Sequence, residues 1–343
     1  MSATTGGGAP LLDVRDLTKV YPSRRGLFSR AGPAVRAVAR VSFTIDRGET
    51  LGLVGESGSG KSTTARLVLR LVPATSGQVF FAGEDVLRLD RRRLRAVRRQ
   101  MQIVFQDPAA SLNPRRTVGA TLGEALVLRG RARDRSPREE IAALLARVGL
   151  EPAAAGRYPH EFSGGQRQRI GIARALAVAP ALIVADEPVS ALDVSVGAQI
   201  VNLLVDLQRE LGIAYLFIAH DLRLVEHVSD RVAVMYAGEI VEMAPVGALY
   251  RDPLHPYTRA LLAAAPALDP ARRDRSLPLA GEPPDPARRP AGCAFHPRCP
   301  EAIPECARIV PLWEEKRIGR WASCIRVEPS LATSGGAPAR PGG

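Results

Sequence analysis

The sequence predicts an α/β fold with a parallel sheet at its centre, and three observations lead to this prediction. A glycine-rich loop over residues 55–62 lies between a short apolar segment and a segment with helical spacing. Residues 181–185 and 214–219 are continuous apolar runs, which are typical of buried parallel strands. A segment with helical spacing around residues 196–211 separates these two runs, as in a strand–helix–strand unit.

The first half of the chain alternates short apolar runs with one helical pattern. Residues 62–71 have helical spacing and follow the glycine-rich loop directly. A basic loop separates the first two expected strands. The strands expected in this half are residues 11–20, 41–45, 50–54, 77–81 and 103–105.

The middle of the chain, from about residue 119 to residue 179, has a mainly helical pattern. The pattern breaks at residues 157–165, where a proline and two glycines end one helix before the next begins. Beyond Tyr250 the chain is rich in proline and arginine. Residues 1–10 are rich in glycine and threonine and residues 331–343 have no apolar period, so we expect both to be disordered.

Length and charge limit the function classes. A chain of 343 residues can bury a large core, and no N-terminal signal peptide or bilayer-spanning run of ~18 apolar residues is apparent, so we expect a cytosolic protein. The net charge of +12 would suit nucleic acid, but the basic residues are nearly all arginine, which indicates a GC-rich genome as much as a binding surface. Residues 88–99 hold seven arginines and no aromatic side chain for bases to stack on. We therefore expect a solvated helix face there and no nucleic-acid partner.

The glycine-rich loop fits the phosphate-binding motif G-x-x-x-x-G-K-[ST]. Bare glycine backbone can turn its N–H groups inward around an anion, and the following helix points its positive end at the same place. Lys61 would reach the β- and γ-phosphates of a nucleotide, and Ser62 would ligate Mg²⁺. The residues expected to bind ATP here are Gly55, Glu56, Ser57, Gly58, Ser59, Gly60, Lys61, Ser62 and Thr63.

Two acids and a histidine follow buried strands, at the edge where open α/β sheets bind ligands. Asp186 would help to hold Mg²⁺, as the second acidic element of a phosphate-loop site does. Glu187 would orient and deprotonate a water for attack on the γ-phosphate. His220 would lie beside the same phosphate. Helix capping by the acids and a structural role for the histidine are the alternatives.

A second possible anion site lies at Ser163, Gly164 and Gly165, where a hydroxyl, bare amides and a helix dipole coincide. The chain thus has two phosphate sites but one loop lysine, Lys61. The economical arrangement is that the second site closes on a nucleotide held by another chain. A glycine-containing helix start without a ligand is the alternative.

Taken in order, these motifs resemble the ATPase subunit of an ABC transporter over residues 11–250. The residues that carry the resemblance are Gly55, Gly60, Lys61, Ser62, Gln106, Ser163, Gly164, Gly165, Gln166, Ala185, Asp186, Glu187, Pro188, Ser190, Ala191, Leu192, Asp193 and His220. The resemblance implies that Gln106 contacts Mg²⁺ or the attacking water and relays closure to the membrane subunits, and that Asp193 links two sites across a dimer. It also places Tyr21 where the family stacks an aromatic ring on adenine. Phe162 stands where leucine is widespread, so we expect altered packing and no lost chemistry.

The resemblance implies a RecA-like P-loop NTPase core with an antiparallel β part, an inserted α-helical subdomain at about residues 107–179 and a small C-terminal extension. We expect the ABC ATPase domain to span residues 11–250 and the extension residues 251–330. Two such chains would hold two ATP molecules between loop and signature, and closure would move attached permeases.

Two stretches, residues 104–119 and 250–266, resemble ATPases of oligopeptide and dipeptide importers, and residues 22–38 and 184–196 look most like their second ATPase subunit. This resemblance implies two transmembrane permease subunits, an extracytoplasmic solute-binding protein and a sister ATPase or a second copy, at the cytoplasmic face of the cell membrane. Nickel and glutathione importers share the same stretch and are alternatives.

Two other function classes are alternatives to an importer subunit. A soluble ABC ATPase acting on DNA or ribosomes would typically carry a coiled coil or two fused cassettes. A module that binds ATP without turnover would lack Glu187 or an intact signature.

The cysteines form a cluster in the sequence, at Cys293, Cys299, Cys306 and Cys324. A cytosolic chain disfavours disulfides, which leaves metal or cluster ligation by thiolates. The spacings C-x₅-C, C-x₆-C and C-x₁₇-C are looser than the pairs of structural zinc sites, whereas a [4Fe–4S] cluster also needs four cysteines. Similar cysteine sets in the peptide-importer ATPases are associated with such a cluster. A zinc site that includes His296 and free buried thiols stay open as alternatives.

Overall fold

The structure of the chain is a computed structural model that describes residues 9–22, 34–107, 111–129, 136–264, 281–285 and 287–330. Of the residues expected to be disordered, 1–8 and 331–343 lie outside these ranges. Most of the expected insertion at residues 22–38 also lies outside them.

The larger of two sheets has eight strands in the order β11-β12-β10-β9-β3-β8-β7-β6. Strands β9, β3, β8, β7 and β6 pair in parallel, and the others pair antiparallel. The bounds of these strands are β3 Thr50–Val54, β6 Met101–Val104, β7 Leu182–Asp186, β8 Ala214–Ile218, β9 Arg231–Tyr236, β10 Glu239–Pro245, β11 Glu314–Arg317 and β12 Arg320–Ala322. The predicted parallel sheet is therefore confirmed, with more strands than the sequence indicated.

The central strands are buried on both faces, as their continuous apolar runs predict. Every residue of β3, β7 and β8 is buried. Alternate residues face two different parts of the core: Leu182 and Val184 pack on one side of the sheet, and Ile183 and Ala185 on the other. The pairing brings the carboxyl ends of three strands to one edge, because Leu53 and Asp186 both pair with Ile218.

A smaller antiparallel sheet has four strands in the order β2-β1-β4-β5. Its bounds are β1 Leu12–Tyr21, β2 Val35–Ile45, β4 Ser76–Phe81 and β5 Glu84–Asp85. Helix α1 (Lys61–Val68) packs between the two sheets, since Leu67 shares one core with Leu12 of the small sheet and Leu53 of the large one. This helix ends three residues earlier than the sequence predicted, and Arg70 beyond it adopts a left-handed φ of 50°.

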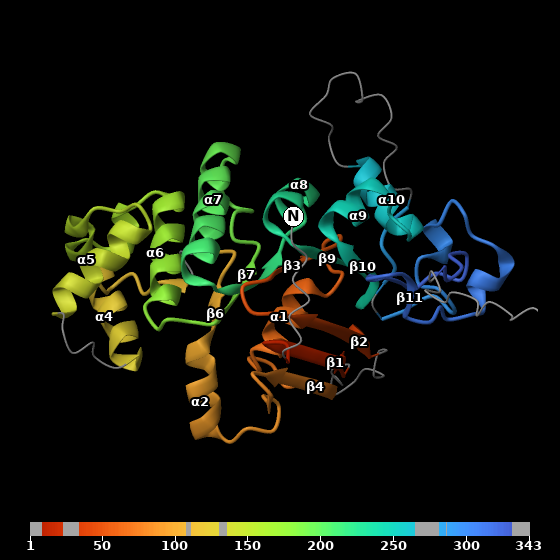
Figure 1. Ribbon diagram of the computed structural model, residues 1–343, viewed down its shortest axis with the longest axis horizontal. Helices are drawn as coiled ribbons and strands as arrows, with labels where there is room; N and C mark the ends of the chain where they lie inside the picture. Colours follow the sequence, from red (N-terminus) through yellow and green to blue (C-terminus); the bar gives the residue numbers. More distant parts are fainter. Residues whose placement is uncertain are drawn as a thin grey trace, which may run out of the picture.

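Figure 1 shows the helices α4, α5 and α6 at one end of the long axis and the C-terminal segment at the opposite end. The helix bounds are α2 Arg91–Gln100, α4 Val118–Arg129, α5 Pro137–Arg147, α6 Gly164–Leu176, α7 Val194–Leu211, α8 Leu222–Val228, α9 Val246–Arg251 and α10 Pro256–Ala264. The arginine run forms α2, where Val97 alone is buried, so the expected solvated helix face is confirmed. Helices α8, α9 and α10 were not predicted from the sequence.

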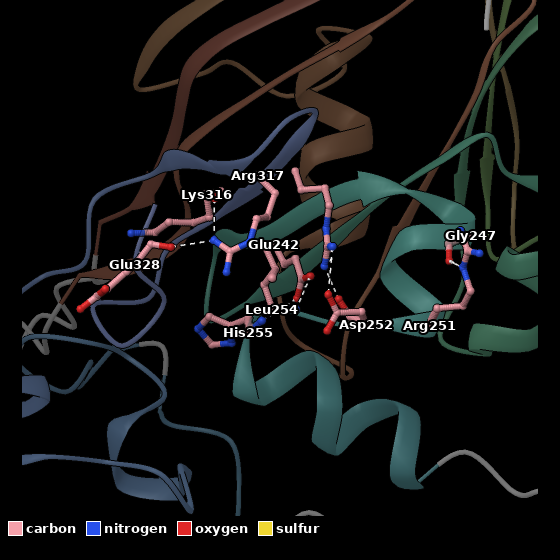
Figure 2. A network of polar contacts seen from close by, with 10 residues as sticks. Glu242, Gly247, Arg251, Asp252, Leu254, His255, Lys316, Arg317 and Glu328 are labelled. Carbon is pink, nitrogen blue, oxygen red and sulfur yellow. Dashed lines mark hydrogen bonds and ion pairs between the residues drawn. The ribbon is translucent and has the colours of Figure 1, made fainter. Parts of the chain in front are cut away.

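The C-terminal segment joins the large sheet through β12, whose Ala322 and Trp321 pair with Glu242 and Met243 of β10. Glu242 is fully buried, and its two carboxylate oxygens accept the backbone N–H groups of Leu254 and His255, each at 2.8 Å. Figure 2 shows this carboxylate directed at the turn that leads into α10. Glu242 therefore ties the sheet to the start of the C-terminal segment.

His255 lies in the same turn and is held in its neutral form. Its Nδ1 accepts the backbone N–H of Tyr257 at 3.0 Å. Burial, followed by the nearby charge of Arg259, lowers the pKa of His255 from 6.5 to about 3. In the unfolded chain this imidazole regains its ordinary pKa near ~6.5. Folding therefore gains stability from the neutral histidine above pH ~6.5 and loses it as pH falls below that value.

We expect the His255→Gln variant to be less sensitive to acid than the wild type. Between pH 7.5 and 5.5 the wild type should lose about 1 kcal/mol of unfolding free energy through His255. The loss of unfolding free energy in the variant should be smaller than in the wild type by this amount. Urea midpoints at both pH values measure the difference. His227→Gln, at an exposed position, is the matched control and should behave like the wild type. Equal acid sensitivity in His255→Gln and the wild type would contradict the assignment.

Candidate functional site

A pocket of about 360 Å³ lies at the carboxyl edge of the parallel strands, beside the start of α1. This volume lies within the range of small-molecule sites, ~300–1,000 Å³. The lining residues are Val35, Arg36, Ala37, Glu56, Ser57, Gly58, Ser59, Gly60, Lys61, Ser62, Thr63, Gln106, Glu187, Tyr236, Ala237, Gly238, Pro283 and Pro284. The structure thus brings most of the predicted loop together with Gln106 and Glu187.

The loop between β3 and α1 needs glycine where it meets its neighbours. Gly60 has a φ of 107°, and a Cβ there would lie 2.4 Å from the carbonyl oxygen of Ala37. Lys61 is 5% exposed, and its Nζ donates to the carbonyl oxygens of Gly55 at 2.7 Å and Glu56 at 2.9 Å. Burial lowers the pKa of Lys61, while nearby carboxylates, Glu187 first, raise it. The ammonium therefore lies in a dry site among acceptors, where it would bind phosphate strongly.

Ser62 lines the pocket, and its hydroxyl meets the carboxylate of Asp186, which ends β7 and does not itself line the pocket. The Ser62 hydroxyl donates to Oδ1 of Asp186 at 2.8 Å, across 124 residues of sequence. Burial raises the pKa of Asp186, and the hydrogen bond from Ser62 lowers it. Hard oxygen donors of this kind fit Mg²⁺, which takes one or two carboxylates together with substrate phosphates.

Glu187 is held in an unusual backbone conformation directly after β7. Its φ is 48°, and its N–H donates to the carbonyl oxygen of Ile218 at 2.9 Å. A non-glycine residue in this region costs of order 1–3 kcal/mol, and such strain concentrates at functional sites. The amide of Gln106 donates to Oε2 of Glu187 at 3.3 Å, and Nδ1 of His220 lies 3.5 Å from the same oxygen. The three side chains assigned to hydrolysis from the sequence are therefore neighbours.

Tyr21, the residue predicted to stack on adenine, does not line the pocket. It pairs with Val35 at the end of the β1–β2 ladder, and Lys19 lies over its ring at 4.8 Å. Val35 lines the pocket, whereas Tyr21 does not. Stacking of Tyr21 on a base therefore stays a prediction.

Several lining residues were missed from the sequence. These are Val35, Arg36 and Ala37 of β2, the turn Tyr236–Gly238 between β9 and β10, and the two prolines 283 and 284. The turn is visible in hindsight, because "YAGE" joins two apolar runs as a hairpin does. Nothing local in the sequence indicates that the prolines return to the loop.

The residues predicted to form a second anion site lie at the start of α6, outside this pocket. Ser163 caps the helix: its hydroxyl accepts the N–H of Gln166 at 3.3 Å, while the Gln166 side chain accepts the N–H of Ser163 at 3.0 Å. Ser163 and Gln166 are exposed, and neither lines the nucleotide pocket. Phe162 before them is buried, with the Arg157 guanidinium over its ring at 4.3 Å.

Gly165 places this helix against α7. A Cβ on Gly165 would lie 2.3 Å from Cγ1 of Val196, so the two helices meet without room for a side chain. Asp193 precedes α7 and lines a hollow of about 230 Å³ together with Glu187 and His220. The start of α6 and the start of α7 are thereby joined to the edge that carries Glu187.

The four cysteines are free thiols in the C-terminal segment. Cys306 and Cys324 are buried, and Cys293 and Cys299 are half-buried. Burial is the main cause that raises the pKa of Cys293 to about 11, and the thiols of the other three cysteines act in the same direction. Within the described residues, no three histidine, cysteine or acidic side chains are arranged to hold a single metal ion.

Two protein-family models match the chain. The model described as ABC transporter matches residues 38–190, and the model described as oligopeptide/dipeptide transporter, C-terminal region, matches residues 241–306. The second match covers β10, α9, α10 and three of the four cysteines.

Named relatives are similar over nearly the whole length. The chain is 56% identical to the probable peptide ABC transporter ATP-binding protein y4tS of Sinorhizobium fredii, over 94% of this chain and 91% of that protein. It is 50% identical to the oligopeptide transport ATP-binding protein AppF of Bacillus subtilis, over 94% and 98%. It is 48% identical to the oligopeptide transport ATP-binding protein OppF of Escherichia coli, over 96% and 100%.

A solved structure shares the fold of the larger part of the chain. The dimeric ATP-binding cassette MJ0796, in a post-hydrolysis state bound to ADP and Pi, superposes with a TM-score of 0.60 at 31% identity. The likeness covers 68% of this chain and 98% of that one.

We expect Gly165→Ala to lower the unfolding free energy by about 1–3 kcal/mol, because the added methyl group overlaps Val196. Adding Val196→Ala should restore much of this loss, since the nearest remaining atom lies at 3.8 Å. Gly171→Ala in the same helix is the control: nothing lies within 4 Å of its Cβ, so stability should be unchanged or higher. Urea denaturation measures the unfolding free energies of the three variants. A Gly165→Ala variant as stable as the wild type would refute the close contact.

Proposed function

The chain belongs to the family of ATP-binding proteins of ABC transporters, and on this premise we propose that it energises the import of peptides across the cytoplasmic membrane. The observation that carries the peptide assignment is the match of residues 241–306 to the C-terminal region of oligopeptide and dipeptide transporters. Relatives whose names state peptide or oligopeptide transport support it, because they align over almost the entire chain.

The chemistry starts with capture of the triphosphate by the loop. The N–H groups of the loop and the start of α1 would bind the phosphate oxygens, and Lys61 would neutralise the β- and γ-phosphates. Its burial, with 5% of the residue exposed, strengthens this electrostatic contact. Ser62, Asp186 and Gln106 would hold Mg²⁺, which supplies charge neutralisation on the transferred phosphate.

Hydrolysis needs a base next to the γ-phosphate, and Glu187 has the geometry for this role. Its carboxylate lies at the rim of the pocket between the Gln106 amide at 3.3 Å and the His220 ring at 3.5 Å. Gln106 and His220 would fix the direction of the carboxylate, so that one oxygen accepts the proton of the attacking water. The positive φ of Glu187 is a strained conformation of the kind that concentrates at functional sites.

A second chain would complete each site. Ser163, Gly164 and Gly165 expose a helix N-terminus outside the pocket of their own chain, and this end suits the γ-phosphate held by a partner. Asp193 shares a hollow with His220 and would connect the two halves of the dimer. The partner is a sister ATPase or a second copy of this chain.

Transport requires membrane subunits that this chain does not provide in its described part. None of the helices that the structure describes is long and apolar enough to cross a membrane. We infer that two transmembrane permease subunits bind at the cytoplasmic face, with an extracytoplasmic solute-binding protein delivering the peptide. Nickel and glutathione are the alternative cargoes for the same machinery.

A transport assay tests this function. The chain, reconstituted with two permease subunits in liposomes, should hydrolyse ATP and take up peptide. Glu187→Gln should slow hydrolysis at least ~100-fold with little change in ATP affinity, because only proton transfer is lost. Lys61→Ala should instead weaken ATP binding itself. Wild-type turnover by Glu187→Gln would remove the assigned base, and uptake of nickel or glutathione without peptide would reassign the cargo.

We also propose that the four cysteines hold a [4Fe–4S] cluster. The N–H of Cys293 donates to the carbonyl oxygen of Cys306, and the other three thiols raise the pKa of Cys293, which supports ligation of one cluster by all four cysteines. The thiol pKa values of Cys293, Cys299 and Cys324 are raised mainly by burial, so bound metal would stabilise their thiolates. The cluster would fasten a segment with short strands and few buried apolar side chains.

Anaerobic purification tests the cluster. We expect a brown protein with about four irons per chain, as ligation by four cysteines requires. Cys306→Ser should lose iron and lower the melting temperature. A colourless preparation that contains stoichiometric zinc, or no metal and four titratable thiols, would refute the cluster and would leave the ATPase assignment unaffected.

A further inference from the structure

Glu56, the second residue of the phosphate loop, is bound at three points. Arg298 forms a bidentate ion pair with its carboxylate, with Nη1 to Oε2 at 2.7 Å and Nη2 to Oε1 at 3.0 Å. The backbone N–H of Glu56 donates to Oη of Tyr257 at 3.0 Å. Its carbonyl oxygen accepts Nζ of Lys61 at 2.9 Å. Two of the three contacts therefore come from the C-terminal segment.

The Arg298 guanidinium is buried, with the Glu56 carboxylate and the Tyr236 ring beside it. Its side chain is 6% exposed, and the Glu56 carboxylate, through its hydrogen bonds, raises the pKa of Arg298 above its ordinary value. The Tyr236 ring lies 5.8 Å from the guanidinium, and its hydroxyl accepts Nη1 at 3.4 Å. A buried guanidinium that loses its carboxylate is costly, so Glu56 and Arg298 hold each other in place.

An aromatic cluster fixes Arg298 relative to the sheet. Tyr236 at the end of β9, Tyr257 in α10 and Phe295 in the cysteine-bearing segment pack with ring centroids 4.6, 5.2 and 5.3 Å apart. Each of the three is at most 2% exposed. Phe295 begins the short helical turn His296–Arg298, so a buried ring lies three residues before the guanidinium.

Backbone hydrogen bonds also hold together the segment that contains Arg298. Cys293 donates its N–H to the carbonyl oxygen of Cys306 at 2.8 Å, and Arg298 donates to Phe295 at 3.0 Å. Pro283 and Pro284, further back in the C-terminal segment, line the nucleotide pocket itself. The C-terminal segment thus contacts the phosphate loop through the side chains of Arg298 and Tyr257. It also lines the pocket with the two prolines.

We propose that Arg298, with Tyr257, is a positioning residue for ATP binding: it holds Glu56, and through Glu56 the phosphate loop and Lys61, in the geometry that accepts the triphosphate. The proposal rests on the ATPase function of the site. The loop is rich in glycine and serine, so its free form would sample many conformations. Contacts that restrict it before ATP arrives reduce the ordering cost of binding.

The chemistry of the contact is specific for arginine. A guanidinium satisfies both carboxylate oxygens at once, whereas a lysine ammonium is a point charge that satisfies one. Arg298 acts on the phosphate loop through Glu56, whereas Glu187 and His220 follow β7 and β8. Its loss should therefore act on ATP affinity and leave the chemical step nearly unchanged.

The test is the kinetic behaviour of Arg298→Met in the full chain, with ATP as the ligand. We expect the KM for ATP to rise on the order of tenfold, as the loss of a charge-assisted contact implies, with kcat within about twofold. Arg298→Lys should recover part of the loss. Glu56→Gln should raise KM similarly, and the double variant Glu56→Gln/Arg298→Met should be no worse than either single variant, because the two residues act as one contact.

Arg259→Met is the matched control. Arg259 also ties the C-terminal segment together, through an ion pair with Glu301 at 3.1 Å, but it does not contact the loop. Its variant should keep the wild-type KM. An equal rise in KM in both arginine variants, or additive effects in the double variant, would overturn the proposal. Should Arg298→Met fail to fold, Tyr257→Phe, which removes only the hydroxyl, must still raise KM. A wild-type chain without ATPase activity would instead refute the proposed function.

Discussion

The parallel pairing of β3, β8 and β7 is the constraint on which the rest of the site depends. Leu53 and Asp186 both lie opposite Ile218, so the loop after β3 and the acids after β7 leave the sheet at the same level. A shift of one residue would exchange the two faces of a strand that is buried on both sides. Because β3, β7 and β8 contribute alternately to two core regions, such a shift would disturb both. The hydrophobic core thus sets the 2.8 Å contact between Ser62 and Asp186.

Electrostatics adds a second layer to this arrangement. Lys61 is desolvated among carboxylates, Asp186 is desolvated beside a hydroxyl and Glu187 is fixed by an amide and a ring. The surroundings of each group are thus built from side chains of distant elements. The helical part joins in through α6, because the Gln168 side chain donates to the carbonyl oxygen of Phe105 at 3.4 Å, next to Gln106. Motion of α6 would therefore reach Gln106 through the backbone of the preceding residue, Phe105.

The sequence predicted what is encoded locally and missed what depends on distant pairing. The loop, the acids after an apolar run and the capped start of α6 each have a motif within a few residues, and their positions along the chain could be assigned. The strands β9 and β10 were missed although they are apolar, because their neighbours carry no motif that draws attention to them. Strand β11 consists of charged residues and β12 of three residues only, and neither shows a strand pattern; β12 pairs with the edge that β10 offers, and β11 pairs with β12. The Arg298–Glu56 contact spans 242 residues, and no periodicity or spacing indicates it.

The same sheet explains why a small C-terminal segment can influence a site so far away in sequence. Its strands are too short to be stable alone, and it gains order by pairing with β10, by the Glu242 contacts to the turn before α10 and by burial of Phe295 against Tyr236 and Tyr257. Tyr236 ends β9, which pairs directly with β3, the strand that enters the phosphate loop. The segment is therefore anchored to the same sheet that positions the loop. Arg298 and the phosphate loop with Glu56 are both held by this one sheet. A side chain mounted on such a continuous sheet can restrict a flexible glycine-rich loop, whereas the same side chain on a mobile tail could not.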